Sequence, residues 1–107
     1  MIFQNSPFEI LDKAFKNLYP GKSYIAFIDV DMKDASGEKV YGCTQFNDCD
    51  TPIIFIDSSL SIQNAVEIFA HELAHVATEA NEGHGELWEK AFDEIQREYN
   101  RIGEEIW

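Results

Sequence analysis

Residues 68–77 read IFAHELAHVA, an apolar run that contains two histidines and a glutamate in the pattern HExxH. Residues four apart on a helix lie on the same face with Cβ atoms about 5–6 Å apart, so the imidazoles of His71 and His75 can bind one metal ion. Catalytic zinc takes three protein ligands and a water, which Glu72 could reach as a general base. Burying two imidazoles without a partner would cost free energy. The run therefore predicts a helix that holds one zinc ion (Zn²⁺) and activates a water molecule.

The helix that carries this motif cannot supply the third ligand. Glu79 continues the row of His71 and His75, but at about 1.5 Å per residue it lies about 12 Å from His71 along the helix axis. One ion cannot span that distance, so the chain must turn back. Residues 81–83, Asn-Glu-Gly, are typical of a turn, and a glycine at this place often ends a helix.

The histidine that follows this turn, His84, is the predicted third ligand. Gly85 comes next and lets the backbone pack closely against its neighbours. Glu82 and Glu86 are alternatives, because zinc also accepts carboxylate oxygens. The predicted metal centre therefore combines the two motif histidines with a third group from residues 82–86.

HELAH at residues 71–75 and HGELW at residues 84–88 together resemble the minimal zincin metallopeptidases. The resemblance is closest to the SprT-like group, whose pattern is HExxH, a spacer, then HGxx followed by Trp or Phe. The matching residues are His71, Glu72, His75, His84, Gly85 and Trp88. The resemblance covers residues 53–95 and implies that the three histidines bind zinc and that the glutamate is the catalytic acid and base. Unlike the larger SprT-like proteins, the chain has no cysteine-rich zinc ribbon.

The resemblance also implies where a substrate would bind. In zincins an edge strand of the sheet lies above the metal and pairs with an extended substrate. By resemblance this strand is expected at Gly42, Cys43, Thr44, Gln45 and Phe46. Strand addition of this kind supplies affinity through backbone hydrogen bonds.

The expected activity is that of a zinc-dependent metallopeptidase acting on a peptide or protein substrate. Zinc lowers the pKa of its bound water towards 7, and Glu72 would take the proton and pass it to the leaving amine. Tyr24, Tyr41 and Tyr99 are candidates to stabilise the oxyanion. Two alternatives stay open: a non-catalytic zinc-binding module that binds a protein partner, and a DNA-associated protease of the SprT type. The intact glutamate favours catalysis, because a structural site does not need it.

Three helices are predicted from caps and from apolar residues at helical spacing. The first begins with Ser6 as its cap and Pro7 in its first turn. The second carries the motif, runs over residues 62–80 and is capped by Ser61. The third begins near Gly85, and its tryptophan is expected to fix His84 by packing. The predicted inner face of the third helix consists of Leu87, Trp88, Ala91, Phe92, Ile95, Tyr99 and Ile102.

Three short segments between the first two helices are predicted to be strands. Residues 24–30 and 39–46 are rich in β-branched and aromatic side chains, and the polar turn at residues 33–37 predicts a hairpin between them. Residues 53–56 are continuously apolar, as expected near the centre of a sheet. The order of elements predicts one α+β domain over residues 1–107, with helices on one side of a small three-stranded mixed sheet.

The charge of the chain disfavours two classes of partner. The chain has 8 Lys and Arg against 20 Asp and Glu, for a formal net charge of −12. Such acidity argues against binding nucleic-acid backbones or anionic membranes, which attract clustered Lys and Arg. Neither a secretory signal nor a membrane span is recognisable, so we expect a cytoplasmic protein. Cys43 and Cys49 do not have a zinc-ligand spacing. We expect them to be reduced thiols, and a disulfide between them in an exported protein is the alternative.

Overall fold

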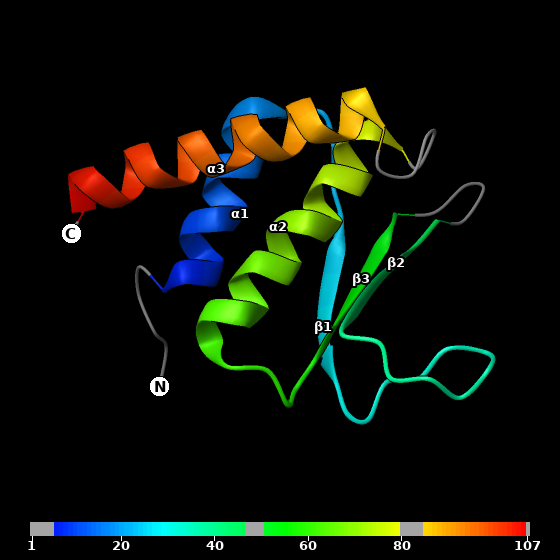
Figure 1. Ribbon diagram of the computed structural model, residues 1–107. Helices are drawn as coiled ribbons and strands as arrows, with labels where there is room; N and C mark the ends of the chain where they lie inside the picture. Colours follow the sequence, from blue (N-terminus) through cyan, green and yellow to red (C-terminus); the bar gives the residue numbers. More distant parts are fainter. Residues whose placement is uncertain (1–5, 47–50, 80–84, 107) are drawn as a thin grey trace.

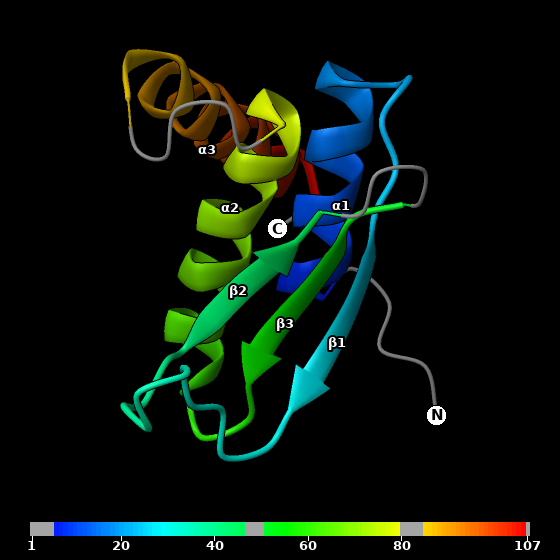
Figure 2. The ribbon, with the colours of Figure 1, turned by 90° about the vertical axis from the view of Figure 1, so that its right-hand side faces the viewer.

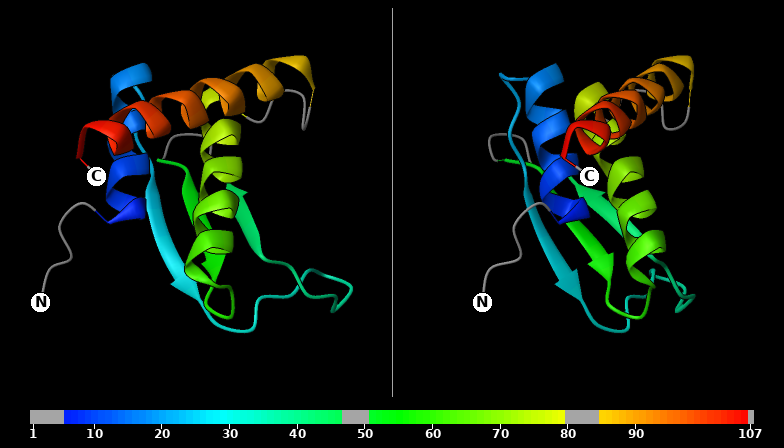
Figure 3. Two further views of the ribbon diagram at one scale, coloured as in Figure 1. Left: turned by 60° about the vertical axis from the view of Figure 1, so that its left-hand side comes forward. Right: turned by 90° about the vertical axis from the view of Figure 1, so that its left-hand side faces the viewer.

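The computed structural model describes residues 6–46, 51–79 and 85–106. In chain order its elements are α1 (Pro7–Leu18), β1 (Ile25–Asp29), β2 (Gly42–Gln45), β3 (Ile53–Asp57), α2 (Ile62–Thr78) and α3 (Glu86–Ile106). The predicted α+β class and order of elements are confirmed. Helix α3 lies across α1 and α2 (Figure 1). The three strands stand in front of the helices in Figure 2 and behind them in Figure 3, so the helices cover one face of the sheet.

The N-terminal caps of α1 and α2 are the predicted ones. The Ser6 hydroxyl oxygen accepts a hydrogen bond from the backbone N–H of Glu9 at 3.2 Å. The Ser61 hydroxyl oxygen accepts one from the N–H of Asn64, also at 3.2 Å. Each cap satisfies one of the backbone donors that a helix leaves unpaired in its first turn. Both helices therefore begin where local sequence places them.

Helix α2 ends at Thr78, slightly before the predicted end near Ala80. Glu79 follows with a φ of 57°, the left-handed conformation that ends helices and that a glycine would adopt more easily. Its carboxylate accepts a hydrogen bond from the ammonium group of Lys22 at 2.6 Å. This ion pair holds the end of α2 against the segment before β1. Gly83, the residue expected to end the helix, lies outside the described residues.

The predicted hairpin is wrong, because β3 lies between the two strands that were expected to pair. The sheet order is β1-β3-β2, with β1 parallel and β2 antiparallel to β3. Lys33 and Lys39 form an isolated antiparallel bridge beside the predicted turn, but β1 and β2 do not pair with each other because β3 lies between them. The physical reason is burial, since β3 is the apolar strand and the central position covers both of its edges. Its predicted place at the centre of the sheet is thereby confirmed.

The core lies between the helix-facing side of the sheet and the three helices. Its main cluster contains buried side chains from α1, β3, α2 and α3, namely Leu11, Phe15, Ile54, Ile56, Ala65, Phe69, Ala70, Leu73, Ala74, Val76, Ala91 and Ile95. The predicted inner face of α3 is correct at Ala91, Ile95 and Ile102, which are buried. It is wrong at Leu87, which is 55% exposed. This residue lies in the first turn of α3, where it borders an open hollow with Ala77 instead of packing into the core.

None of the described helices covers the other face of the sheet (Figure 2). Because side chains alternate along a strand, Ile25 and Phe27 share this face with Ile53 and Phe55, their partners across the β1–β3 ladder. The Phe27 and Phe55 rings stack with their centroids 5.8 Å apart. Ile25 and Phe27 remain about half exposed. Within the described ranges, none of the helices has the length and apolarity needed to cross a membrane.

A buried carboxylate fixes the long connection between β1 and β2. Asp57, at the end of β3, has a fully buried side chain that accepts hydrogen bonds from the Lys39 ammonium at 2.8 Å and the Met32 N–H at 3.1 Å. Its second oxygen accepts from the N–H and hydroxyl of Ser59. The Lys39 bond, followed by the Ser59 bond, holds the pKa of Asp57 far below its usual range.

This lowered pKa predicts a stability that is lost in acid. Because the folded-state pKa lies below that of the unfolded chain, Asp57 stabilises the fold fully above about pH 4 and progressively less as the pH falls further. Thermal unfolding followed by circular dichroism between pH 6 and pH 3 should therefore show a steeper loss of Tm in the natural protein than in Asp57→Asn. Asp93→Asn, at an exposed position of α3, is the control and should keep the steep loss. Equal slopes for the natural protein and Asp57→Asn would contradict the prediction.

Candidate metal centre

The two motif histidines lie together on one face of α2. The rings of His71 and His75 have centroids 5.1 Å apart and planes inclined by 68°. With zinc–nitrogen bonds of about 2.0–2.1 Å, two imidazoles that share one ion at a tetrahedral angle have ring centres about 5 Å apart. The pair therefore fits a shared zinc ion. Both side chains are partly buried, which leaves the face accessible.

Glu72 is the buried acid of this face, and it comes from the same turn of the helix. Only 6% of the residue is exposed. Its Oε1 accepts a hydrogen bond from the hydroxyl of Thr44 in β2 at 2.8 Å. Its Oε2 lies 4.0 Å from Nε2 of His71. One oxygen of the carboxylate is thus hydrogen-bonded to a strand of the sheet. The other lies near the ring of His71, one of the predicted metal ligands.

Strand β2 approaches this part of α2 unusually closely, and Gly42 makes the approach feasible. A Cβ atom added at Gly42 would lie 2.4 Å from Cγ2 of Ile68 and 3.4 Å from Oε2 of Glu72. The first distance is well inside van der Waals contact, so no larger residue fits without movement. The strand predicted to bind substrate is therefore an edge strand, as expected, and it packs directly on the motif helix.

Trp88, near the start of α3, contacts both histidines. Its ring centroid lies 4.7 Å from that of His71 and 5.6 Å from that of His75. Its indole N–H donates a hydrogen bond to the backbone carbonyl of His71 at 3.2 Å. On its other side it stacks on Phe92, with centroids 5.0 Å apart. Sequence reasoning assigned this tryptophan to His84; in the described residues it orients the other two imidazoles.

The predicted third ligand, His84, lies in a part of the chain that is not described. His84 and its alternative Glu82 lie outside the described residues, whereas Glu86 is exposed at the first position of α3. Among the residues that the structure describes, no three His, Cys, Asp or Glu side chains form a group that could hold a metal ion. The described site thus comprises two imidazoles and a carboxylate, and a third ligand from residues 82–86 stays a prediction.

The three tyrosines considered for oxyanion stabilisation come from elements other than the motif helix. The Tyr24 hydroxyl donates to the carboxylate of Asp12 on α1, and burial is the first cause that raises its pKa. Tyr99 borders the space between α1, α2 and α3. Tyr41 precedes Gly42, so strand alternation directs it to the opposite face of the sheet from the helices. The expectation of a tyrosine at the oxyanion therefore has no structural support from these positions.

Because side chains alternate along β2, the side chain of Cys43 also points away from α2. Burial raises the pKa of its thiol, and the negative charges of Glu72 and Asp29 raise it further. A raised pKa favours the neutral thiol, whereas zinc binds the thiolate. Cys43 belongs to no group of three potential metal ligands among the residues that the structure describes, and the question of its pairing with Cys49 concerns a residue outside those ranges.

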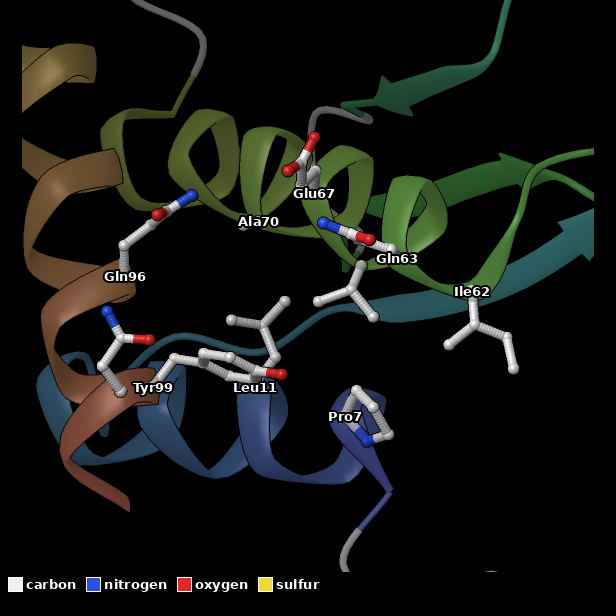
Figure 4. A pocket seen from close by; sticks show the side chains of 10 residues that line it. Pro7, Leu11, Ile62, Gln63, Glu67, Ala70, Gln96 and Tyr99 are labelled. Atoms are coloured by element: carbon white, nitrogen blue, oxygen red, sulfur yellow. The ribbon is translucent and has the colours of Figure 1, made fainter. Parts of the chain in front are cut away.

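A cavity of about 520 Å³ lies elsewhere, between the three helices (Figure 4). Its α2 lining includes Val66 and Ala70, and Tyr99 borders it from α3. Since successive residues turn by about 100° around a helix, Ala70 and Glu72 point about 200° apart. The cavity is therefore on the opposite face of α2 from Glu72 and is separate from the metal centre.

One feature of the site was missed by sequence reasoning, namely the side-chain role of Thr44. The residue was predicted only as part of a strand that pairs with substrate. The alternation of strand side chains could have placed Thr44 and Gly42 on the same face. Which element that face meets could not be read from the sequence.

Comparisons of the chain with protein-family models, with curated proteins and with solved structures find no match. The class of site is thus defined by its own residues: a helical HExxH motif with its glutamate buried against an edge strand.

The position of Trp88 predicts an optical signal for metal binding. Trp107→Phe leaves Trp88 as the sole tryptophan. Cobalt, which binds nitrogen sites of this kind and has unpaired electrons, should quench the Trp88 fluorescence, because the indole lies against both predicted ligands. The measurement is a fluorescence titration with cobalt, followed by displacement with zinc. If the same quenching persisted after His71 and His75 were both replaced by alanine, the metal would be bound elsewhere.

Proposed function

We propose that this protein is a zinc-dependent metallopeptidase of the minimal zincin type, related to the SprT-like group. The observation that carries the proposal is the arrangement on α2. Two imidazoles lie at a separation that suits one zinc ion, and a buried carboxylate lies next to them and against an edge strand. Each part has a role in peptide hydrolysis, whereas a structural zinc site would need only the ligands.

His71 and His75 would hold the ion together with His84, and the bound zinc would polarise the substrate carbonyl and lower the pKa of a water molecule. Glu72 accepts a proton from the water molecule while the water oxygen forms a bond to the carbonyl carbon of the substrate. When the C–N bond breaks, Glu72 returns the proton to the amine nitrogen. Trp88 keeps the His71 ring in place through its ring contact and its hydrogen bond to the His71 carbonyl.

The substrate class follows from the neighbouring strand. An extended peptide can add to the outer edge of β2, which pairs with no described strand, and backbone hydrogen bonds would hold it there without regard to its side chains. The net charge of −12 disfavours nucleic acid as a partner and reduces the case for a DNA-associated protease. A basic peptide would be attracted by the same charge.

Metal analysis and a cleavage assay on the purified protein test the proposal together. We expect close to one zinc per chain by mass spectrometry and cleavage of members of a peptide library, both lost after treatment with a chelator. One zinc per chain with no cleavage would favour the non-catalytic binding module instead. No bound zinc under conditions that load other zinc proteins would refute the metal centre.

A further inference from the structure

We propose that Thr44 is a positioning residue that links substrate pairing at β2 to the orientation of Glu72. The inference rests on the proposed function and assigns a new role within that site. The backbone of Thr44 lies at the edge where a substrate would pair, and its side chain contacts the carboxylate of Glu72.

The register of the β2–β3 ladder determines where the backbone groups of Thr44 point. The N–H of Asp57 donates to the carbonyl of Tyr41 at 3.0 Å, which makes this a hydrogen-bonded pair directed into the sheet. In an antiparallel ladder such pairs alternate with pairs whose backbone groups point outward. The backbone N–H and carbonyl groups of Cys43 and Gln45 therefore point towards β3. Those of Gly42 and Thr44 point to the outer edge of β2, which pairs with no described strand.

The side chain of Thr44 points to α2, where it contacts Glu72. The Thr44 hydroxyl donates to Oε1 of Glu72 at 2.8 Å, the usual length of a hydrogen bond from a hydroxyl to an oxygen. The bond fixes the rotation of a carboxylate that has little room to move, because the residue is buried and β2 packs closely at Gly42. With Oε1 held by Thr44, the second oxygen, Oε2, lies 4.0 Å from Nε2 of His71, on the side of the predicted metal ligands.

The backbone and the side chain together give Thr44 its role. A peptide that pairs with the backbone of Thr44 orders the strand, and the ordered strand holds the threonine hydroxyl where it aligns the general base. Loss of the hydroxyl should therefore slow the chemical step while leaving the backbone pairing of substrate intact. That predicts a change in kcat with little change in KM.

Thr44→Val tests this, because valine has the same shape and lacks the hydroxyl. Loss of one hydrogen bond to a charged group should lower kcat by about 10-fold to 100-fold. KM and zinc content should stay close to those of the natural protein. Thr44→Ser keeps a hydroxyl and should restore most of kcat. Thr51→Val, at a threonine that precedes β3, is the matched control. If Thr44→Val did not fold, as judged by circular dichroism, Thr44→Ala would replace it.

The outcomes separate this inference from the proposed function. If the natural protein cleaves peptides, Glu72→Gln does not and Thr44→Val cleaves with unchanged kcat, the role of Thr44 is overturned and the metallopeptidase proposal stands. A reduced kcat in both Thr44→Val and Thr44→Ser would also overturn it, since the effect would not follow the hydroxyl. If the natural protein loaded with zinc cleaves no peptide, the proposed function and this inference both fail.

Discussion

Replacing Glu72 by glutamine is expected to abolish peptide hydrolysis while the protein keeps its zinc. Glutamine has the same shape and can still accept the Thr44 hydrogen bond through its amide oxygen, but it cannot take a proton from water. General-base catalysis contributes about 10²-fold to 10⁴-fold, so kcat should fall by at least about 100-fold. Zinc content by mass spectrometry and kcat against a library-derived peptide are the two measurements.

The control for this variant is His75→Ala, which should lose both zinc and activity. The contrast separates the ligand from the base, because only the histidine donates a nitrogen to the ion. A Glu72→Gln protein that cleaved the same peptide at the natural rate would show that another group acts as base. Loss of zinc from Glu72→Gln would instead show that the carboxylate is needed for binding.

The second large effect is expected at Gly42, where a single methyl group should displace the edge strand. In Gly42→Ala the new Cβ would lie 2.4 Å from Cγ2 of Ile68. That methyl cannot swing away easily, because a β-branched side chain on a helix has one strongly preferred χ1 rotamer. Overpacking of this kind typically costs about 1–3 kcal/mol, which urea denaturation would measure. Activity should fall as well, because Thr44 moves with the strand.

A double-mutant cycle tests whether the clash is the cause. Ile68→Ala removes the methyl that a Cβ at Gly42 would meet, so Gly42→Ala should cost much less in that background. Gly21→Ala is the matched control, because a Cβ built at Gly21 meets no atom within 4 Å. An equal loss of stability in both backgrounds would mean that the backbone of Gly42, and not the contact with Ile68, is responsible.

Local sequence determined the helices and the proximity of the two histidines of the candidate metal centre. The caps at Ser6 and Ser61 were predicted correctly because a cap depends on a hydrogen bond between residues three apart. The approach of His71 to His75 follows in the same way from four-residue spacing on a helix. Such features need no partner from elsewhere in the chain, so a short stretch of sequence specifies them.

Only the tertiary structure decided the strand order and the surroundings of Glu72. Backbone hydrogen bonds of a sheet are nearly the same for every residue, so the sequence of two strands does not reveal whether they pair with each other or with a third. Burial of the apolar β3 favours its central position, so β3 lies between the two strands that were expected to form a hairpin. The contacts of Glu72 with Thr44, and of Ile68 with Gly42, join segments far apart in the chain, and they exist because packing brings an edge strand onto α2.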